Sequence, residues 1–196
     1  MEKKHLVIAS GNKNKLREIA EIFTDYVVIS QKEMGFDVDV EETGETFAEN
    51  ALIKARAAAQ ALGCIALADD SGLCVDALNG APGVYSARYC GHHGSDKENR
   101  DLLLKNMQGV ADRSAHFTCS MALVYPDGRE VVVEGHTYGK ILLEETGDGG
   151  FGYDCLFESD DLQKSFGLAT AEEKNKVSHR FRALQALRQV LEGEQR

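Results

Sequence analysis

Short apolar runs followed by small or polar residues recur along the chain and predict buried strands that alternate with helices. Residues 6–9 and 65–68 are apolar runs of a length typical of buried strands, and residues 26–29 form another candidate strand. After residues 10–12 the spacing changes to that of a helix. Four apolar side chains then share one helical face: Leu16, Ile19, Ala20 and Phe23.

Three further helices are predicted from caps and periodicity. Thr46 and Glu49 have the spacing of a capping box at the start of an Ala-rich helix, and Gly63 is placed to end it. Ser95 and Glu98 predict a second such start, for a helix that runs to about residue 107. The last helix has its apolar face formed by Phe181, Leu184, Leu187 and Leu191.

The remaining segments complete an α/β pattern. Residues 116–125 and 130–138 predict two strands joined by a hairpin turn at 126–129. The acidic stretch 37–45 has little tendency to helix or strand, and the Gly-rich loop 147–154 precedes a short apolar run. We therefore expect one domain over residues 1–196, an α/β fold with a mixed sheet flanked by helices.

Composition and charge narrow the function classes. The net charge is −10 and no basic run is present, so a nucleic-acid partner is excluded, because phosphate neutralisation needs clustered Lys and Arg. A small polyanion such as a nucleotide stays compatible with a local basic pocket and a bound cation. The scarcity of proline, with only Pro82 and Pro126, argues against linkers or a disordered tail.

Cysteine usage and the first residues predict a cytoplasmic protein. The five cysteines are odd in number and form no CxxC pair, so we interpret them as buried apolar thiols rather than as disulfides or a zinc site. The apolar stretch 6–9 is too short for a signal peptide or a membrane span. We therefore expect no membrane partner.

Residues 10–15 form the first cluster that suggests chemistry. Gly11 lets the backbone approach a ligand, Asn12 offers an amide, and Lys15 projects from the first helical turn. These groups suit phosphate at a helix start. An ordinary helix cap is the alternative, and the segment is neither a Walker A loop nor GxGxxG.

The second cluster is the Asp69-Asp70 pair, expected in a turn over residues 69–72 at the end of a strand. A carboxylate there needs a partner or a cation, and hard cations such as Mg²⁺ take carboxylate oxygens. Adjacent residues in an extended segment point to opposite sides, so only one Asp need face a site. By the residues alone, Glu41 and Glu42 fit a solvated loop better than a metal site.

Two more clusters lie toward the C-terminus. Phe151 and Tyr153 stand beside glycines and could stack a flat base or pack in the core, while Asp154 could accept from a ring N–H. The basic group around the last helix start is Lys174, Lys176, His179, Arg180 and Arg182. Helical spacing would put Lys176, His179 and Arg180 on one side. With Ser178 as the N-cap, cations at this helix start oppose the helix dipole, which hints at an anionic ligand.

The remaining histidines suggest no site. His92 and His93 lie between glycines and His116 lies in a predicted strand, and neither group has metal-binding spacing such as HExxH. We interpret them as loop surface and strand face. No cysteine sits in a recognisable nucleophile turn.

Taken in order, these segments resemble the inosine triphosphate pyrophosphatase family. Any one of them is weak evidence, but the ordered set is specific and spans nearly the whole chain. The resembling segments are residues 10–15, 41–51, 68–73, 80–89, 149–154, 173–174 and 178–180.

The resemblance implies an elongated two-lobed fold with a nucleotide cleft between the lobes, and a homodimer. It implies Mg²⁺ as cofactor, with Asp70 as metal ligand and general base and Glu41 as the second metal ligand. Cys155 departs from the Pro that many relatives have there, which bears on the rigidity of the loop. The implied substrate-binding residues are Ser10, Gly11, Asn12, Lys13, Asn14, Lys15, Ser71, Phe151, Gly152, Tyr153, Asp154, Lys174, His179 and Arg180.

The expected reaction is hydrolysis of ITP, dITP or XTP to the monophosphate and pyrophosphate. His179 and Arg180 would donate to a 6-oxo group, which adenine lacks; guanine has one, so rejection of GTP must depend on the 2-position. Three alternatives stay open: a pyrophosphatase for modified pyrimidines, a nucleotide sensor without turnover, and an α/β domain that binds partner proteins. The base-pocket residues argue against the first, and the joint presence of Lys15, Glu41 and Asp70 argues against the second.

Overall fold

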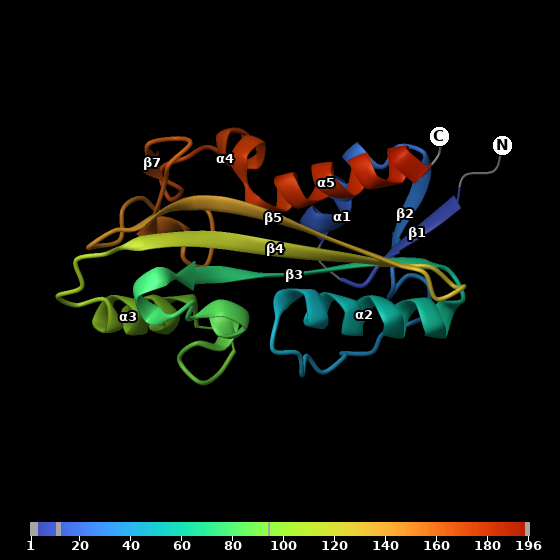
Figure 1. Cartoon of the computed structure of the whole chain (residues 1–196), viewed down its shortest axis with the longest axis horizontal. Helices are drawn as coiled ribbons and strands as arrows, with labels where there is room; N and C mark the ends of the chain where they lie inside the picture. Colours follow the sequence, from blue (N-terminus) through green and yellow to red (C-terminus); the bar gives the residue numbers. More distant parts are fainter. Residues whose placement is uncertain (1–3, 11–12, 94, 195–196) are drawn as a thin grey trace. The chain divides into compact units, whose positions relative to one another are not determined.

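The apolar runs form the strands of one mixed sheet, which confirms the predicted α/β class (Figure 1). The computed structural model describes residues 4–10, 13–93 and 95–194. The strand order is β2-β1-β3-β4-β5-β6-β7, with β1 parallel to β2 and β3, and β6 antiparallel to β5 and β7. The strands are β1 (Lys4–Ile8), β2 (Tyr26–Ser30), β3 (Ile65–Val75), β4 (Ser114–Val124), β5 (Glu130–Ile141), β6 (Phe157–Ser159) and β7 (Lys164–Ser165).

The helices follow the predicted caps. Thr46 and Glu49 form a full capping box at α2, and Gly63 ends that helix in the left-handed conformation. Ser95 accepts a hydrogen bond from the backbone of Glu98 at the start of α3. The helices are α1 (Lys13–Ile22), α2 (Phe47–Leu62), α3 (Asp96–Asn106), α4 (Ala171–Val177) and α5 (His179–Glu194), with short 3-10 turns at Asp76–Leu78, Gly83–Arg88 and Asp154–Leu156.

The chain divides into two compact units. The first comprises Met1–Asp70, Ser120–Glu134 and Ala183–Arg196, and the second comprises Ser71–Cys119 and Gly135–Arg182. The boundaries fall inside β3, β4 and β5, so each of these strands contributes residues to both units.

In the first unit, α2 lies on one side of the strands and α1 on the other (Figure 1). The buried face of α2 consists of small residues, Ala51, Ala55, Ala58 and Ala59, which pack with Ala66 and Ala68 of β3 and with Ala122 and Val124 of β4. Small side chains allow the helix backbone to lie close to the sheet, so polar side chains of α2 can contact residues of β3.

The second unit has its own core of large side chains. Phe117, Phe157 and Phe166 form an aromatic group with ring centroids 4.8–6.3 Å apart. They pack with Leu73 of β3 and Leu103 of α3, both fully buried. This core supports the loop that follows β5.

The prediction of a turn at residues 69–72 is wrong, because β3 continues through these residues to Val75. Leu73 and Val75 are buried and extend the apolar pattern of the strand. Asp69 and Asp70 do not end the strand because cationic side chains meet their carboxylates, as described below. The acidic pair therefore lies in the middle of a long strand.

The basic cluster is also arranged differently from the prediction. A break at Ser178, with φ −67° and ψ 151°, separates α4 from α5, so Lys176 does not share a helix face with His179 and Arg180. Ser178 caps α5, since its Oγ accepts from the backbone N–H of Phe181 at 3.1 Å. The capping box of Thr170 and Glu173, which starts α4, was missed.

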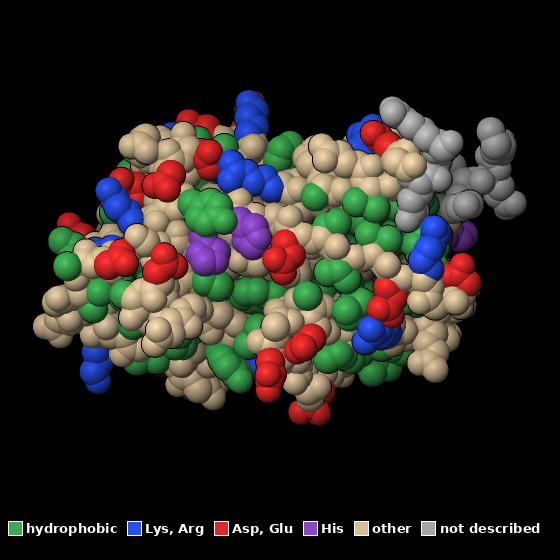
Figure 2. Space-filling view, viewed as in Figure 1, with side chains coloured by type: hydrophobic (Ala, Val, Ile, Leu, Met, Phe, Trp, Pro, Cys, Tyr) green, Lys and Arg blue, Asp and Glu red, His purple; other side chains and the backbone are tan. Residues whose placement is uncertain are grey.

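All five cysteines lie in the described part of the chain and none is in a disulfide, as predicted, but only Cys119 and Cys155 are buried; Cys64, Cys74 and Cys90 are half-buried. Cys155 keeps its loop ordered without a proline, because its carbonyl accepts from the N–H of Thr146 at 2.8 Å. None of the helices in the described part of the chain is long and apolar enough to span a membrane. On the face that Figure 2 draws, Lys and Arg side chains are interspersed with acidic ones rather than gathered in a strip.

The capping box of α2 gives a first prediction. Thr46→Ala removes the side-chain acceptor for the N–H of Glu49 (3.1 Å), so we expect the free energy of unfolding to fall by about 1 kcal/mol. Thr46→Ser keeps the hydroxyl and should lose only a few tenths of that. Urea denaturation followed by circular dichroism measures both; equal losses in the two variants would contradict the capping role.

Candidate active site

Asp69 and Asp70 project to opposite sides of β3, as the alternation of a strand predicts. The carboxylate of Asp69 accepts two hydrogen bonds from Lys15 Nζ, at 2.7 and 2.9 Å. Lys15 comes from the first turn of α1. This ion pair neutralises the more buried of the two carboxylates and ties α1 to β3.

Asp70 faces α2, where a buried amide holds it. Asn50 is fully buried, and its Nδ2 donates to Asp70 Oδ2 at 3.1 Å. The amide oxygen of Asn50 accepts from the N–H of Gly44 at 2.8 Å. Asn50 therefore orients the Asp70 carboxylate and connects it to the acidic segment before α2.

Lys54 lies one turn after Asn50 in α2, and its Nζ is close to oxygen atoms of three residues. Its Nζ donates to Glu42 Oε1 at 2.6 Å and to the carbonyl of Asp69 at 2.8 Å, and it lies 3.8 Å from Asp70 Oδ1. The ammonium group of Lys54 therefore lies within 3.8 Å of the carboxylates of both Glu42 and Asp70.

Sequence reasoning missed Asn50 and Lys54 as members of this cluster, and it weighed Glu42 only as solvated loop or metal ligand, not as a partner of Lys54. Asn50 and Lys54 are spaced i, i+4 in a helix that was predicted correctly, so they share a face. That spacing was the available signal, but the sequence does not show that this face meets Asp70. The predicted metal ligand Glu41 is exposed, and its role stays a prediction.

The structure reports on only part of the predicted phosphate segment. Lys15 lies in the cluster, Ser10 is half-buried just after β1, and Lys13 is exposed at the start of α1. Gly11 and Asn12 lie outside the described residues, and so does the side chain of Asn14.

The second unit contains a cavity of about 180 Å³. This is smaller than the ~300–1,000 Å³ typical of a pocket for a whole drug-sized ligand, so it fits one ring system. It gathers eight residues that the sequence singled out from three separate segments. These are Ser71, Phe151, Gly152, Tyr153, Asp154, Lys174, His179 and Arg180.

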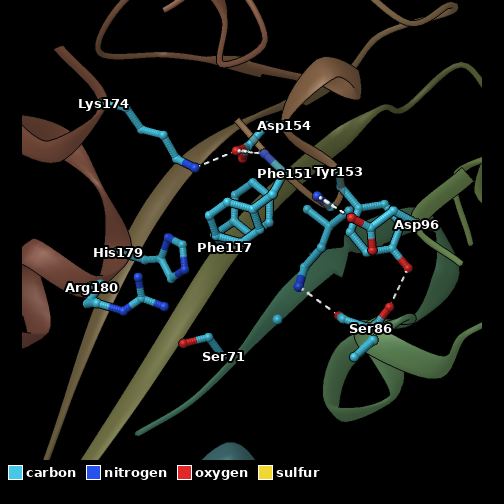
Figure 3. Close-up of a pocket in the computed structure, with 14 residues that line it drawn as sticks. Ser71, Ser86, Asp96, Phe117, Phe151, Tyr153, Asp154, Lys174, His179 and Arg180 are labelled. Carbon is cyan, nitrogen blue, oxygen red and sulfur yellow. Dashed lines mark hydrogen bonds and ion pairs between the residues drawn. The ribbon is translucent and has the colours of Figure 1, made fainter. Parts of the chain in front are cut away.

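One side of the cavity is built around the Asp154 carboxylate (Figure 3). Asp154 pairs with Lys174 Nζ and accepts from the N–H of Phe151 at 2.9 Å. Its side chain is 5% exposed and that of Lys174 is 14% exposed. Breaking a buried pair of this kind costs about 3–5 kcal/mol, so Asp154 serves to hold the loop in shape.

Phe151 and Tyr153 differ in which of the two predicted roles they fit, stacking a flat base or packing in the core. Phe151 is 67% exposed, and Lys174 Nζ lies 4.4 Å from its ring centroid. Tyr153 is buried in the core, and its hydroxyl donates to the carbonyl of Ser86 at 2.7 Å. Burial raises the pKa of Tyr153, which keeps this hydroxyl a proton donor. Only Phe151 therefore offers a ring face to a ligand.

His179 and Arg180 line the cavity from the first turn of α5 and lie side by side in Figure 3. The ring of His179 stacks on Phe117, with centroids 5.1 Å apart and an interplanar angle of 16°. This stacking fixes the plane of the imidazole. The wall thus combines apolar rings with two nitrogen-rich side chains.

Two residues that the sequence did not single out hold the loop from the opposite side. Asp96 Oδ2 accepts from the N–H of Gly152 at 3.0 Å, and Arg100 Nη1 donates to the carbonyl of Gly152 at 3.0 Å. Both side chains come from α3. The backbone of Gly152 is therefore fixed at both its donor and its acceptor.

The chain is similar to known proteins over nearly its whole length. The Ham1 family profile matches residues 6–190. A dITP/XTP pyrophosphatase of Streptomyces coelicolor is 49% identical, covering 93% of this chain and 94% of that protein, and one of Clostridium perfringens is 46% identical, covering 97% and 98%. The solved structure of the Staphylococcus aureus Ham1 protein has a TM-score of 0.93 at 46% identity, covering 97% of this chain and 100% of that one.

The loop geometry predicts different tolerance at two glycines with positive φ. A Cβ at Gly150 would lie 2.2 Å from Asp154 Oδ2, whereas a Cβ at Gly152 meets nothing within 4 Å. Gly152→Ala should cost only the strain of a left-handed alanine, about 1–2 kcal/mol. Gly150→Ala should cost more, because it also displaces Asp154 from Lys174 and Phe151.

Urea denaturation of both variants measures the difference. A crystal structure of Gly150→Ala should show the Asp154–Lys174 pair separated. Equal stabilities for the two alanine variants would contradict the close packing of Gly150 against Asp154.

Proposed function

The chain belongs to the Ham1 family, and on that basis we propose that it hydrolyses non-standard purine nucleoside triphosphates, ITP, dITP and XTP, to the monophosphate and pyrophosphate. The observation that carries the proposal is the cavity, which is sized for one ring system and is lined by Phe151, His179 and Arg180. Ser71 lines the cavity, and one peptide bond joins it to Asp70. Such an enzyme would remove these nucleotides before their incorporation into DNA and RNA.

Base recognition is assigned to the cavity. The exposed ring of Phe151 offers a stacking surface, and His179 and Arg180 supply N–H donors for a 6-oxo group. Adenine presents a 6-amino donor there, so binding ATP would leave buried donors without acceptors. Hypoxanthine and xanthine carry the required oxygen.

Phosphate binding is assigned to the first unit. Lys15 and Lys54 place two ammonium groups beside Asp69 and Asp70, and residues 10–14 at the start of α1 would add backbone and side-chain donors. These positive charges would neutralise the charge that moves to the leaving pyrophosphate.

The residues present fit a magnesium ion. Lys54 already gathers oxygen atoms of Glu42, Asp69 and Asp70, and oxygen is the donor that Mg²⁺ prefers. Asp70 and Glu41 would hold the ion, which would supply charge neutralisation at the triphosphate when bound.

Asp70 is assigned the role of general base. Its carboxylate would orient and deprotonate the water that attacks the α-phosphorus in line with the leaving pyrophosphate. Asn50 holds one oxygen of this carboxylate by a 3.1 Å hydrogen bond. The amide is fully buried and held by Gly44, so it fixes this oxygen, while the second oxygen, Oδ1, lies 3.8 Å from Lys54 Nζ.

Two further expectations accompany this function. Acting on the nucleotide pool implies a cytoplasmic location, and the family resemblance implies a homodimer. Sedimentation analysis of the purified protein tests the dimer.

The substrate assay tests the function directly. With Mg²⁺ present, pyrophosphate release from ITP, dITP and XTP should exceed release from ATP by about a hundredfold or more in kcat/KM, because the 6-amino group of adenine leaves buried donors without their acceptor. GTP, which carries the 6-oxo group, and dTTP are measured beside them. Equal rates on ITP and ATP would refute the substrate claim. A preference for dTTP would favour the pyrimidine alternative.

Asp70→Asn separates an enzyme from a nucleotide sensor. Loss of the base should lower kcat by about 10²–10⁴-fold with little change in nucleotide affinity, since the amide keeps the size of the side chain. Full activity in this variant would contradict the proposed mechanism. Binding of ITP without turnover in the unaltered protein would favour the sensor.

Adjacent glutamates provide a test of the metal site. Glu42 is already paired with Lys54 at 2.6 Å, whereas Glu41 is exposed to an incoming ion. We therefore expect Glu41→Gln to raise the Mg²⁺ concentration for half-maximal activity by about tenfold, and Glu42→Gln to raise it less. Titration of activity with Mg²⁺ measures both, and the reverse order would assign the ion to Glu42.

A further inference from the structure

Three side chains with different metal-binding chemistry come together at the start of α3. Cys90 Sγ lies 3.8 Å from His92 Nε2, and His92 Nε2 lies 2.8 Å from Glu98 Oε2. All three candidate ligand atoms lie within 4.8 Å of one another. We propose that Cys90, His92 and Glu98 form a binding site for Zn²⁺, separate in chemistry from the magnesium site assigned to Asp70.

The spacing of the three atoms suits a tetrahedral ion. Zinc bonds of about 2.3 Å to sulfur, 2.0–2.1 Å to nitrogen and 2.0–2.2 Å to oxygen place neighbouring ligand atoms about 3.4–3.6 Å apart. The observed separations of 3.8 and 2.8 Å lie on either side of that range. The third separation, between the ligand atoms of Cys90 and Glu98, is at most 4.8 Å, so we expect rotations of the exposed His92 and Glu98 side chains to close the site around an ion.

The backbone of Cys90 is anchored to the helix that carries Glu98. The N–H of Cys90 donates to Asn99 Oδ1 at 2.8 Å, and Asn99 is buried next to Glu98 on α3. Asn99 Nδ2 also donates to the carbonyl of Ala87, at 3.3 Å. A pre-formed backbone lowers the entropy that metal binding must overcome.

The position of Glu98 offers its side chain another role, in the cap of α3. As the third residue of a helix capped by Ser95, it has the spacing to complete a capping box. Its carboxylate instead lies against the imidazole of His92. The chain thus turns an acidic side chain toward a histidine and a thiol, which are ligands that zinc prefers.

The imidazole is oriented for coordination through Nε2. His92 Nδ1 lies 3.4 Å from the carbonyl of His93, and a carbonyl in this place favours the tautomer with the proton on Nδ1. The His92 and Glu98 side chains are 60% and 57% exposed, so an ion can enter and keep water as a fourth ligand. Bound zinc would tie the loop to the helix turn from which Asp96 holds Gly152.

Titration of the full chain with Co²⁺ in place of zinc tests the proposal. A Cys90 ligand should give thiolate-to-cobalt charge-transfer absorption, one equivalent per chain, and added Zn²⁺ should abolish it. The absorption should persist in excess Mg²⁺, because a hard cation competes poorly for sulfur and nitrogen. Lowering the pH from about 7.5 to about 5.5 should weaken binding, since the thiol and imidazole must lose protons.

Matched variants locate the ion. Cys90→Ser should abolish the charge-transfer absorption, and His92→Ala and Glu98→Gln should each weaken Zn²⁺ binding by about tenfold or more. Cys64→Ser and His93→Ala, which alter a cysteine and a histidine outside the cluster, should leave it unchanged. Circular dichroism checks that each variant is folded.

Two results would overturn the proposal. One is the absence of charge-transfer absorption in the unaltered protein, and the other is its survival in Cys90→Ser. Neither bears on the pyrophosphatase assay, because the variants leave Asp70, Lys15 and the cavity residues intact.

Discussion

Asp69 and Asp70 place two carboxylates inside a long strand whose neighbours are buried, and charges in such a position require partners. The protein supplies them from both sides of the sheet: Lys15 from α1 for Asp69, and Asn50 with Lys54 from α2 for Asp70. These contacts turn the Lys15 side of α1 and the Asn50–Lys54 side of α2 toward β3.

The same constraint underlies the phosphate and metal chemistry that we propose for the cluster. The small residues on α2 bring its backbone close to β3, which lets a lysine and an amide reach Asp70. The ammonium groups that neutralise the carboxylates are also those that would meet a triphosphate. Stability and proposed chemistry therefore depend on one set of charges, and each carboxylate keeps a distinct role because alternation separates their sides.

The cavity depends on hydrogen bonds and an ion pair rather than on strand alternation: they hold the loop at residues 151–154, and the Phe151 ring stays exposed. Asp154 holds Phe151 and Lys174, while Asp96 and Arg100 hold Gly152. Rigid attachment on both sides leaves the Phe151 ring available at little entropic cost. The hydrogen bonds of this loop are long-range in sequence, and for that reason the pattern of glycines and aromatics left its role open between stacking and core packing.

The sequence by itself determined the α/β class, the capped starts of α2 and α3, and most residues that line the cavity, because periodicity and caps are local and the ordered motifs resemble one family. It was wrong about the turn at residues 69–72 and about a shared side for Lys176, His179 and Arg180. Only the tertiary structure decided that β3 runs through the acidic pair, that Asn50 and Lys54 meet Asp70, and that Cys90 and His92 meet Glu98. These outcomes depend on which helix face packs against which strand, and no local pattern records that choice.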